Sequence, residues 1–239
     1  MRCRLLPLLA LLIAAPALAR DPEAGDAEDE EVSTSLDGVG RISIQGGWRV
    51  TSNETFYKSW YGRESYRELA RPSEASGGPL AVGSFAYAIN DLVELGIDLF
   101  ITGGRLRLNT PEGEQNLDTL SYGAAIGLRF QTVLPEVGPY GLVPFTGILT
   151  GPALTSTKRP DERLQESTTQ VWMGSLGATL RLSPRWGVTA EYRLAFLRGV
   201  VGPPEGRIGS VNTGGSWFTV GVTYSFPPEP SRPLPGGFL

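Results

Sequence analysis

The sequence predicts an all-β protein, an eight-stranded antiparallel up-and-down barrel that crosses a membrane as strands. Three observations support this prediction. The chain opens with an apolar segment typical of an export signal, eight later stretches alternate apolar and polar side chains, and the connections between them alternate between long and short. An even strand number places both ends of the barrel on the side of the short turns, which should be the periplasm.

Residues 1–19 are predicted to be a signal peptide, with a charged start and an A-x-A-type cleavage site at Ala17-Leu18-Ala19. The apolar run is broken by Pro7 and Pro16 and is too short to span a bilayer as a helix. Once this segment is removed, the chain holds neither cysteine nor histidine. Residues 20–39 carry eight carboxylates and are expected to form a disordered acidic leader.

The barrel is predicted over residues 40–226. Its strands are expected at residues 41–50, 80–89, 93–101, 119–130, 140–150, 172–182, 186–196 and 218–226. Long loops are expected near residues 51–79, 103–118, 152–168 and 199–214, and each predicted strand has about the length of a tilted membrane-crossing strand.

The first, third and fourth strands alternate clearly, whereas the second and fifth are apolar on both faces, so that their orientation stays open. The sixth, seventh and eighth strands alternate again. Residues typical of the apolar faces are Ile42, Trp48, Leu95, Ile97, Leu99, Tyr122, Ile126, Phe130, Trp172, Leu176, Trp186, Tyr192, Phe196, Phe218, Val220 and Val222.

The opposite faces are rich in small residues such as Ser43, Gly96, Ser121 and Gly177. Small side chains suit the narrow interior of an eight-stranded barrel. A soluble barrel with an apolar interior has the same period, but its water-facing surface would carry Lys, Glu and Gln, and lysine is scarce here. Turning the charged face to lipid would cost about 2–4 kcal/mol for each Arg near the bilayer centre. The apolar faces are therefore expected to contact lipid.

The last strand carries the pattern Thr219-x-Gly221-x-x-Tyr224-x-Phe226. With residues 140–147 and 190–193, it resembles the small outer-membrane β-barrel proteins of diderm bacteria, the group that includes the OmpA membrane domain, OmpX and OmpW. This resemblance implies a cell outer-membrane location, contact with outer-membrane lipid, and recognition of the last strand by the barrel-assembly machinery. The chain departs from the group in the residues after Phe226: residues 227–239, with five prolines, are expected to form an extended periplasmic tail.

Catalysis is not predicted. Without histidine, the chain lacks the triads and imidazole metal ligands of hydrolases. Glu94 and Asp98 lie about 13 Å apart along one strand, whereas a glycosidase pair needs about 5–9.5 Å. No cofactor or metal is expected, and the chain offers no imidazole ligand. No nucleic-acid partner is expected, because the basic residues are scattered and the calculated pI is near 5.1.

Charged residues on the inward face form a candidate network: Arg41, Arg49, Glu94, Asp98, Arg129, Arg181, Glu191 and Arg193. Buried charges must be paired, so one interpretation is a structural plug of the lumen. The other interpretation is a narrow polar or ion pathway, gated by rearrangement of the same pairs.

The first long loop holds Phe56, Tyr57, Trp60, Tyr61 and Tyr66 among charged residues, and residues 65–70 could form a helical turn. Such aromatics serve either as a cap or interface girdle of the barrel or as a surface-recognition site. The predicted role is structural or surface-interacting, with an unidentified surface ligand. A small pore or transporter for ions or small hydrophobic solutes is the alternative, and a soluble secreted barrel is a third.

Overall fold

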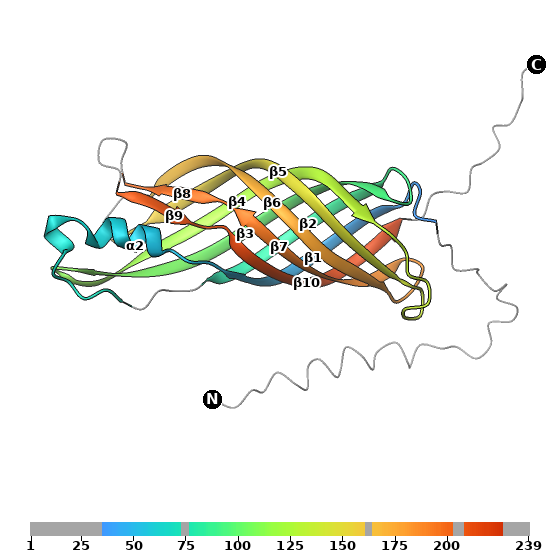
Figure 1. Ribbon diagram of the computed structural model, residues 1–239, viewed down its shortest axis with the longest axis horizontal. Helices are drawn as coiled ribbons and strands as arrows, with labels where there is room; N and C mark the ends of the chain where they lie inside the picture. Colours follow the sequence, from blue (N-terminus) through green and yellow to red (C-terminus); the bar gives the residue numbers. More distant parts are fainter. Residues whose placement is uncertain (1–34, 73–76, 161–163, 203–207, 227–239) are drawn as a thin grey trace, which may run out of the picture. The chain divides into compact units, whose positions relative to one another are not determined.

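The computed structural model describes residues 35–72, 77–160, 164–202 and 208–226 (Figure 1). The predicted signal peptide, the acidic leader up to residue 34 and the proline-rich tail lie outside these residues. Residues 35–39, the last five of the predicted leader, are described, and Leu36 packs against the barrel. None of the helices in the described ranges is long and apolar enough to cross a membrane.

The described residues confirm the predicted ring of eight antiparallel strands. The strands pair in the order β1-β10-β7-β6-β5-β4-β3-β2, and β1 pairs with β10 to close the barrel. Their bounds are β1 Gly40–Val50, β2 Gly78–Ala88, β3 Val93–Thr110, β4 Gly113–Gln131, β5 Leu142–Lys158, β6 Gln165–Arg181, β7 Trp186–Phe196 and β10 Gly215–Phe226. The first and last strands of the ring begin and end at the same rim, with the short turns (Figure 1).

The apolar faces point outward, as predicted. Ile44 is 75% exposed and Leu99 is 61% exposed, whereas Asp98 between two outward neighbours is fully buried. The structure also settles the two open strands. In β2, Leu80 and Val82 point into the barrel, and in β5 Phe145 does so.

The predicted loop at residues 103–118 is wrong, because β3 and β4 continue through it and join at a tight turn. Outward and inward side chains still alternate there, but the hydrophobic residues now point inward and the charged residues point outward. Outward positions change from Ile101 to Arg105, while inward positions change from Asp98 to Leu106. The inversion occurs where the strand leaves lipid for water, and Gly103-Gly104 lies at this change.

The predicted loops at 152–168 and 199–214 are also partly wrong. Strands β5 and β6 extend to Lys158 and from Gln165, and their polar Ser and Thr residues hide the continuing alternation. A separate antiparallel hairpin of β8 (Arg198–Val201) and β9 (Gly209–Asn212) stands above the ring.

The first long connection contains helix α2 (Glu54–Tyr61) and the 3-10 turn η2 (Glu64–Tyr66), whereas a turn was expected only at 65–70. Helix α2 is amphipathic because Phe56, Tyr57 and Trp60 share one buried face. Glu54 and Lys58 form an i,i+4 ion pair of 2.9 Å on its exposed face, in the favourable orientation.

Leu99→Arg should lower the free energy of unfolding by about 2–4 kcal/mol, because the guanidinium would face hydrocarbon near the middle of the lipid-facing part of β3. Glu166→Arg is the matched control: this exposed position lies on the β6 extension, and the change should stay within about 0.5 kcal/mol. Denaturant unfolding of the protein in lipid vesicles measures both values. Equal losses in the two variants would contradict a lipid-facing β3.

Candidate functional site: the barrel lumen and its extracellular cap

A continuous chain of ion pairs crosses the part of the lumen that is nearer the periplasmic end. Arg41 on β1 binds both Glu94 on β3 and the side-chain oxygen of Gln131 on β4. Arg129 lies 3.6 Å from Glu94, and its Nη2 donates to both oxygens of Asp98 at 2.7 and 2.9 Å. Glu94 and Arg129 meet because they are register partners on adjacent strands.

Arg193 on β7 continues the chain across the lumen. Its Nη2 lies 3.3 Å from Asp98, and its Nε and Nη2 bind Glu191 at 2.8 and 2.7 Å. Gln45 Nε2 donates to Glu191 at 3.3 Å, and Thr219 Oγ1 donates to Gln45 Oε1 at 2.6 Å. Six charged residues, three arginines and three carboxylates, therefore form one network whose formal charges cancel.

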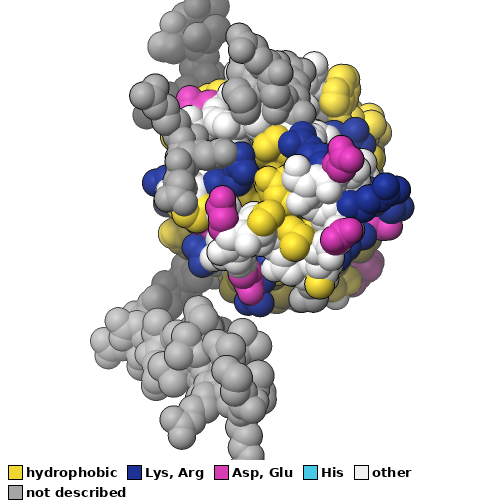
Figure 2. All heavy atoms as spheres, turned by 90° about the vertical axis from the view of Figure 1, so that its left-hand side faces the viewer, with side chains coloured by type: hydrophobic (Ala, Val, Ile, Leu, Met, Phe, Trp, Pro, Cys, Tyr) yellow, Lys and Arg dark blue, Asp and Glu magenta, His cyan; other side chains and the backbone are white. Residues whose placement is uncertain are grey.

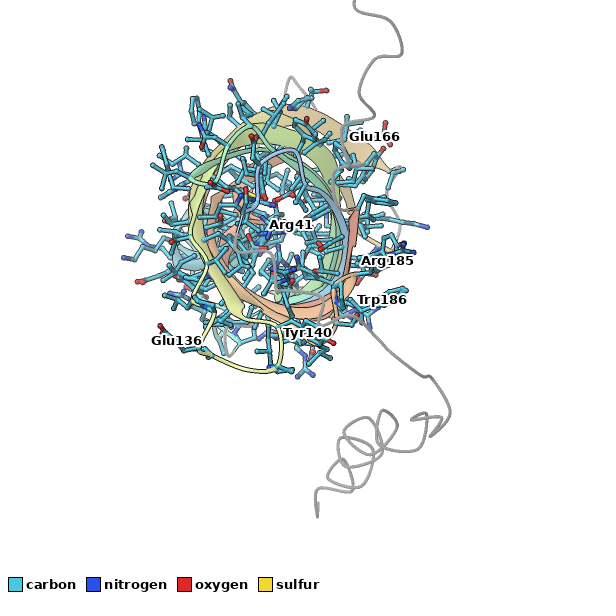
Figure 3. All side chains as sticks on the ribbon, turned by 90° about the vertical axis from the view of Figure 1, so that its right-hand side faces the viewer. Arg41, Glu136, Tyr140, Glu166, Arg185 and Trp186 are labelled. Carbon is cyan, nitrogen blue, oxygen red and sulfur yellow. The ribbon has the colours of Figure 1, made fainter. Side chains whose placement is uncertain are left out.

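The other two predicted network residues lie toward the two ends of the barrel. Arg49 is buried at the outer rim, where it donates to the carbonyls of Thr213 at 2.6 Å and Gly103 at 3.2 Å. Arg181 is half-buried at the last residue of β6, next to the short turns. In the end-on view of Figure 3, Arg41 lies inside the ring, whereas Arg185 and Trp186 lie outside it.

A cavity of about 20 Å³ lies within this network, lined among others by Arg41, Gln45, Arg129 and Glu191. It has room for about one water molecule. Arg129 Nε is buried and has no hydrogen-bond partner among the described residues, so it is a suitable donor to such a water. Within the described residues, no group of three or more side chains is arranged as a metal site.

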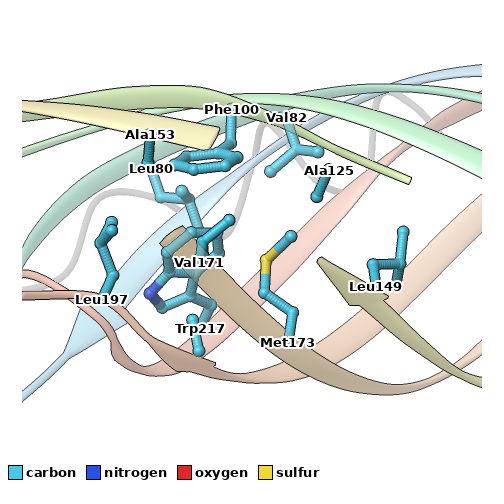
Figure 4. Close-up of a cluster of buried hydrophobic side chains, with 11 residues drawn as sticks. Leu80, Val82, Phe100, Ala125, Leu149, Ala153, Val171, Met173, Leu197 and Trp217 are labelled. Carbon is cyan, nitrogen blue, oxygen red and sulfur yellow. The ribbon is translucent and has the colours of Figure 1, made fainter. Parts of the chain in front are cut away.

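An apolar layer fills the lumen on the extracellular side of the network (Figure 4). This layer was not predicted from the sequence. Phe100 and Trp217 are its largest members, with ring centroids 5.3 Å apart. Phe100 stands on the otherwise polar face of β3, and that exception was the available signal. The layer comprises Leu80, Val82, Phe100, Ala125, Leu149, Ala153, Val171, Met173, Ala195, Leu197 and Trp217.

A second apolar cluster forms the extracellular cap. Helix α2 packs its aromatic face against the inward leucines of the β3–β4 extension and against the β8–β9 hairpin. Its buried members are Phe56, Tyr57, Trp60, Leu106, Leu108, Leu117, Val201 and Val211.

The loop aromatics therefore divide into two groups. Phe56, Tyr57 and Trp60 are at most 1% exposed and belong to the cap, whereas Tyr61 and Tyr66 are partly exposed. Tyr61 Oη accepts a hydrogen bond of 2.9 Å from the Asn109 amide. Figure 2 looks onto this end, where basic and acidic side chains intermix around small apolar patches.

The segment before β1 docks at the periplasmic end of the barrel. Leu36 is 3% exposed and packs with Ala88 and Val143. Asp91, in the β2–β3 turn, accepts hydrogen bonds from the Leu36 amide at 2.6 Å, from Ser35 Oγ at 2.9 Å and from the Asp37 amide at 3.2 Å. The Leu36 and Ser35 hydrogen bonds hold the pKa of the Asp91 carboxyl below its usual value.

The residues of the last-strand pattern occupy both faces of β10. Thr219 and Gly221 face inward, and Tyr224 and Phe226 face outward with ring centroids 4.7 Å apart. Gly221 is required at its position, because a Cβ there would collide with the backbone of Ile44 on β1.

A closed ring with an apolar exterior and an ion-paired interior defines a transmembrane β-barrel. The sequence matches the outer membrane protein beta-barrel domain family over residues 5–226, and the chain belongs to this family. The protein is thus an outer-membrane protein, as the resemblance implied. No curated protein matches the chain.

Solved structures with similar folds include three barrels. Ail of Yersinia pestis is 12% identical, covers 80% of this chain and 100% of its own, and has a TM-score of 0.45. Neisserial surface protein A is 15% identical, with coverages of 80% and 98% and a TM-score of 0.47. OprG of Pseudomonas aeruginosa is 12% identical, with coverages of 80% and 97% and a TM-score of 0.49.

Asp98→Ala should lower the free energy of unfolding by about 3–5 kcal/mol, because it leaves the buried Arg129 and Arg193 without a shared partner. Asp118→Ala is the matched control: its ion pair with Arg105 is 2.6 Å long but exposed, and it should contribute about 1 kcal/mol or less. Urea unfolding in vesicles compares the two variants. A loss for Asp98→Ala no larger than that of the control would show that the network is not needed for stability.

The docking of Leu36 should weaken in acid. Because the folded pKa of Asp91 is lowered, its contribution is complete above the usual pKa of 3.8 and is lost as the pH falls through the lower folded value. NMR titration of the Leu36 and Asp37 amides should show an inflection below pH 3.8, and Asp91→Asn should abolish it. An inflection that persists in the variant would assign the titration to another group.

Proposed function

We propose that this outer-membrane barrel is a closed, non-enzymatic scaffold that acts through its extracellular surface and does not conduct solutes. One observation carries the proposal: the ion-pair network and the Phe100–Trp217 layer lie in series as two barriers inside the lumen. The Leu36 cluster and the α2 cap lie at its two ends.

The two inner barriers exclude different solutes. An ion entering from the periplasm would have to separate the Arg41, Arg129 and Arg193 pairs, and breaking a buried pair costs about 3–5 kcal/mol. The next layer offers the ion only apolar contacts, which leave a desolvated charge uncompensated. A small apolar solute could enter the second layer more easily but would meet the charges below it.

The cap supports a role at the surface. Its helix is held by a buried aromatic face, and Arg71 lies 5.0 Å from the Tyr57 ring centroid. Tyr57 Oη also donates to the Arg107 carbonyl at 3.2 Å. A cap that is ordered in this way presents its exposed side chains in one arrangement, which reduces the entropy lost on binding a partner.

A small pore remains the competing function, and planar-bilayer recording separates the two. The wild-type barrel should show no stable conductance. Arg193→Ala and Trp217→Ala should each stay closed, because the other layer remains, whereas the double variant should conduct. Heat-modifiable gel mobility checks that each variant folds.

Two results would overturn the proposal. One is steady conductance of the folded wild-type protein. The other is a single variant that conducts as well as the double variant, since that would show that the layers are not independent barriers.

A further inference from the structure

A pocket of about 360 Å³ opens at the extracellular tip of the molecule, outside the lumen and above the buried cap. It lies between η2, the β3–β4 turn and the residue after β5. Its polar and aromatic lining residues are Ser65, Tyr66, Thr110, Glu112, Gln115 and Arg159. The volume falls in the range of about 300–1,000 Å³ that is typical of small-molecule sites.

One side of the pocket is anchored to the cap. Tyr66 stacks on Trp60 with ring centroids 4.8 Å apart and an interplanar angle of 20°. The Arg159 guanidinium lies 5.4 Å from the same indole ring. Because Trp60 is only 1% exposed, both pocket residues rest on a fixed support. The site is therefore organised before any ligand arrives.

The β3–β4 turn supplies the facing side. Thr110 Oγ1 donates to the Gly113 carbonyl at 2.9 Å, which holds the turn together. Gln115 Nε2 donates to Glu112 Oε2 at 3.4 Å, so the carboxylate and the amide lie side by side at the pocket. The carboxylate keeps further acceptor capacity, and the amide keeps a donor and its oxygen.

This lining restricts the chemistry of a ligand. A polyanion would meet Glu112, and a cation would meet Arg159. An apolar ligand would cover these groups without hydrogen bonds. A neutral ligand rich in hydroxyl groups suits both Glu112 and Arg159, because each hydroxyl can donate to a carboxylate and accept from a guanidinium or amide.

The aromatic residue adds a second criterion. One face of Tyr66 is covered by Trp60, so its other face and its edge are the parts left for the pocket. An aromatic face provides flat apolar area next to a polar hydroxyl, and it suits the C–H face of a sugar ring. The geometry points to a binding site for a neutral saccharide, one or two sugar units in size. This inference deepens the proposed surface role by assigning it a ligand class.

The test uses the full mature protein in lipid nanodiscs, with maltose, lactose and N,N′-diacetylchitobiose as probes, and saturation-transfer NMR and calorimetry as readouts. At least one probe should bind. Glu112→Gln and Tyr66→Ala should each weaken that binding by about tenfold or more. Glu114→Ala should leave it unchanged: Glu114 lies on the same hairpin and pairs with Arg107 at 3.7 Å, but it does not line the pocket.

The inference is overturned if none of the three sugars binds at about 10 mM, a concentration that would detect even weak sites. It is also overturned if Glu114→Ala weakens binding as much as Glu112→Gln, or if glycine or a sulfated disaccharide binds the pocket more tightly than the neutral sugars. Bilayer recording on the same preparations keeps the two proposals separate. A conducting barrel would refute the closed scaffold alone, and loss of sugar binding in a closed barrel would concern the pocket alone.

Discussion

The need to pair or hydrogen-bond the charges inside a narrow barrel governs this structure. An eight-stranded ring has an interior only wide enough for its own side chains, so little water is present to solvate an ion. Asp98 illustrates the solution, since it lies between Arg129 and Arg193 and thereby joins strands from opposite sides of the lumen. These contacts join opposite strands through the lumen, in addition to the hydrogen bonds between neighbouring strands. Removal of one partner would therefore affect several strands at once.

The change from lipid to water along β3 explains why its hydrophobic side chains switch from the outward face to the inward face. Within the bilayer the apolar side chains of β3 point outward, and beyond it Leu106 and Leu108 point inward to the α2 helix. Outside the bilayer the same strand shows Arg105, paired with Asp118. The barrel thus becomes an ordinary water-soluble structure at its extracellular end, with an apolar core that the helix completes.

Much of the ring was predictable from sequence because lipid and lumen impose a period of two. The extension of β3 was missed for a physical reason. The period of two continues through Gly103-Gly104, but the apolar residues move from the outward positions to the inward positions. The inward orientation of most network charges could also be predicted from their position in the strands. Their partners across the lumen could not, since Gln45 and Glu191 are 146 residues apart and meet only in the closed ring.

The docked segment before β1 has a consequence for the order of assembly. Leu36 packs in a seat formed by Ala88 at the end of β2 and Val143 at the start of β5. These two strands lie far apart around the ring. A flat, unclosed sheet holds these two residues apart, so the seat exists only after the sheet has curled. Burial of Leu36 is therefore a late folding event, and a fluorophore at this position would report the kinetics of ring closure.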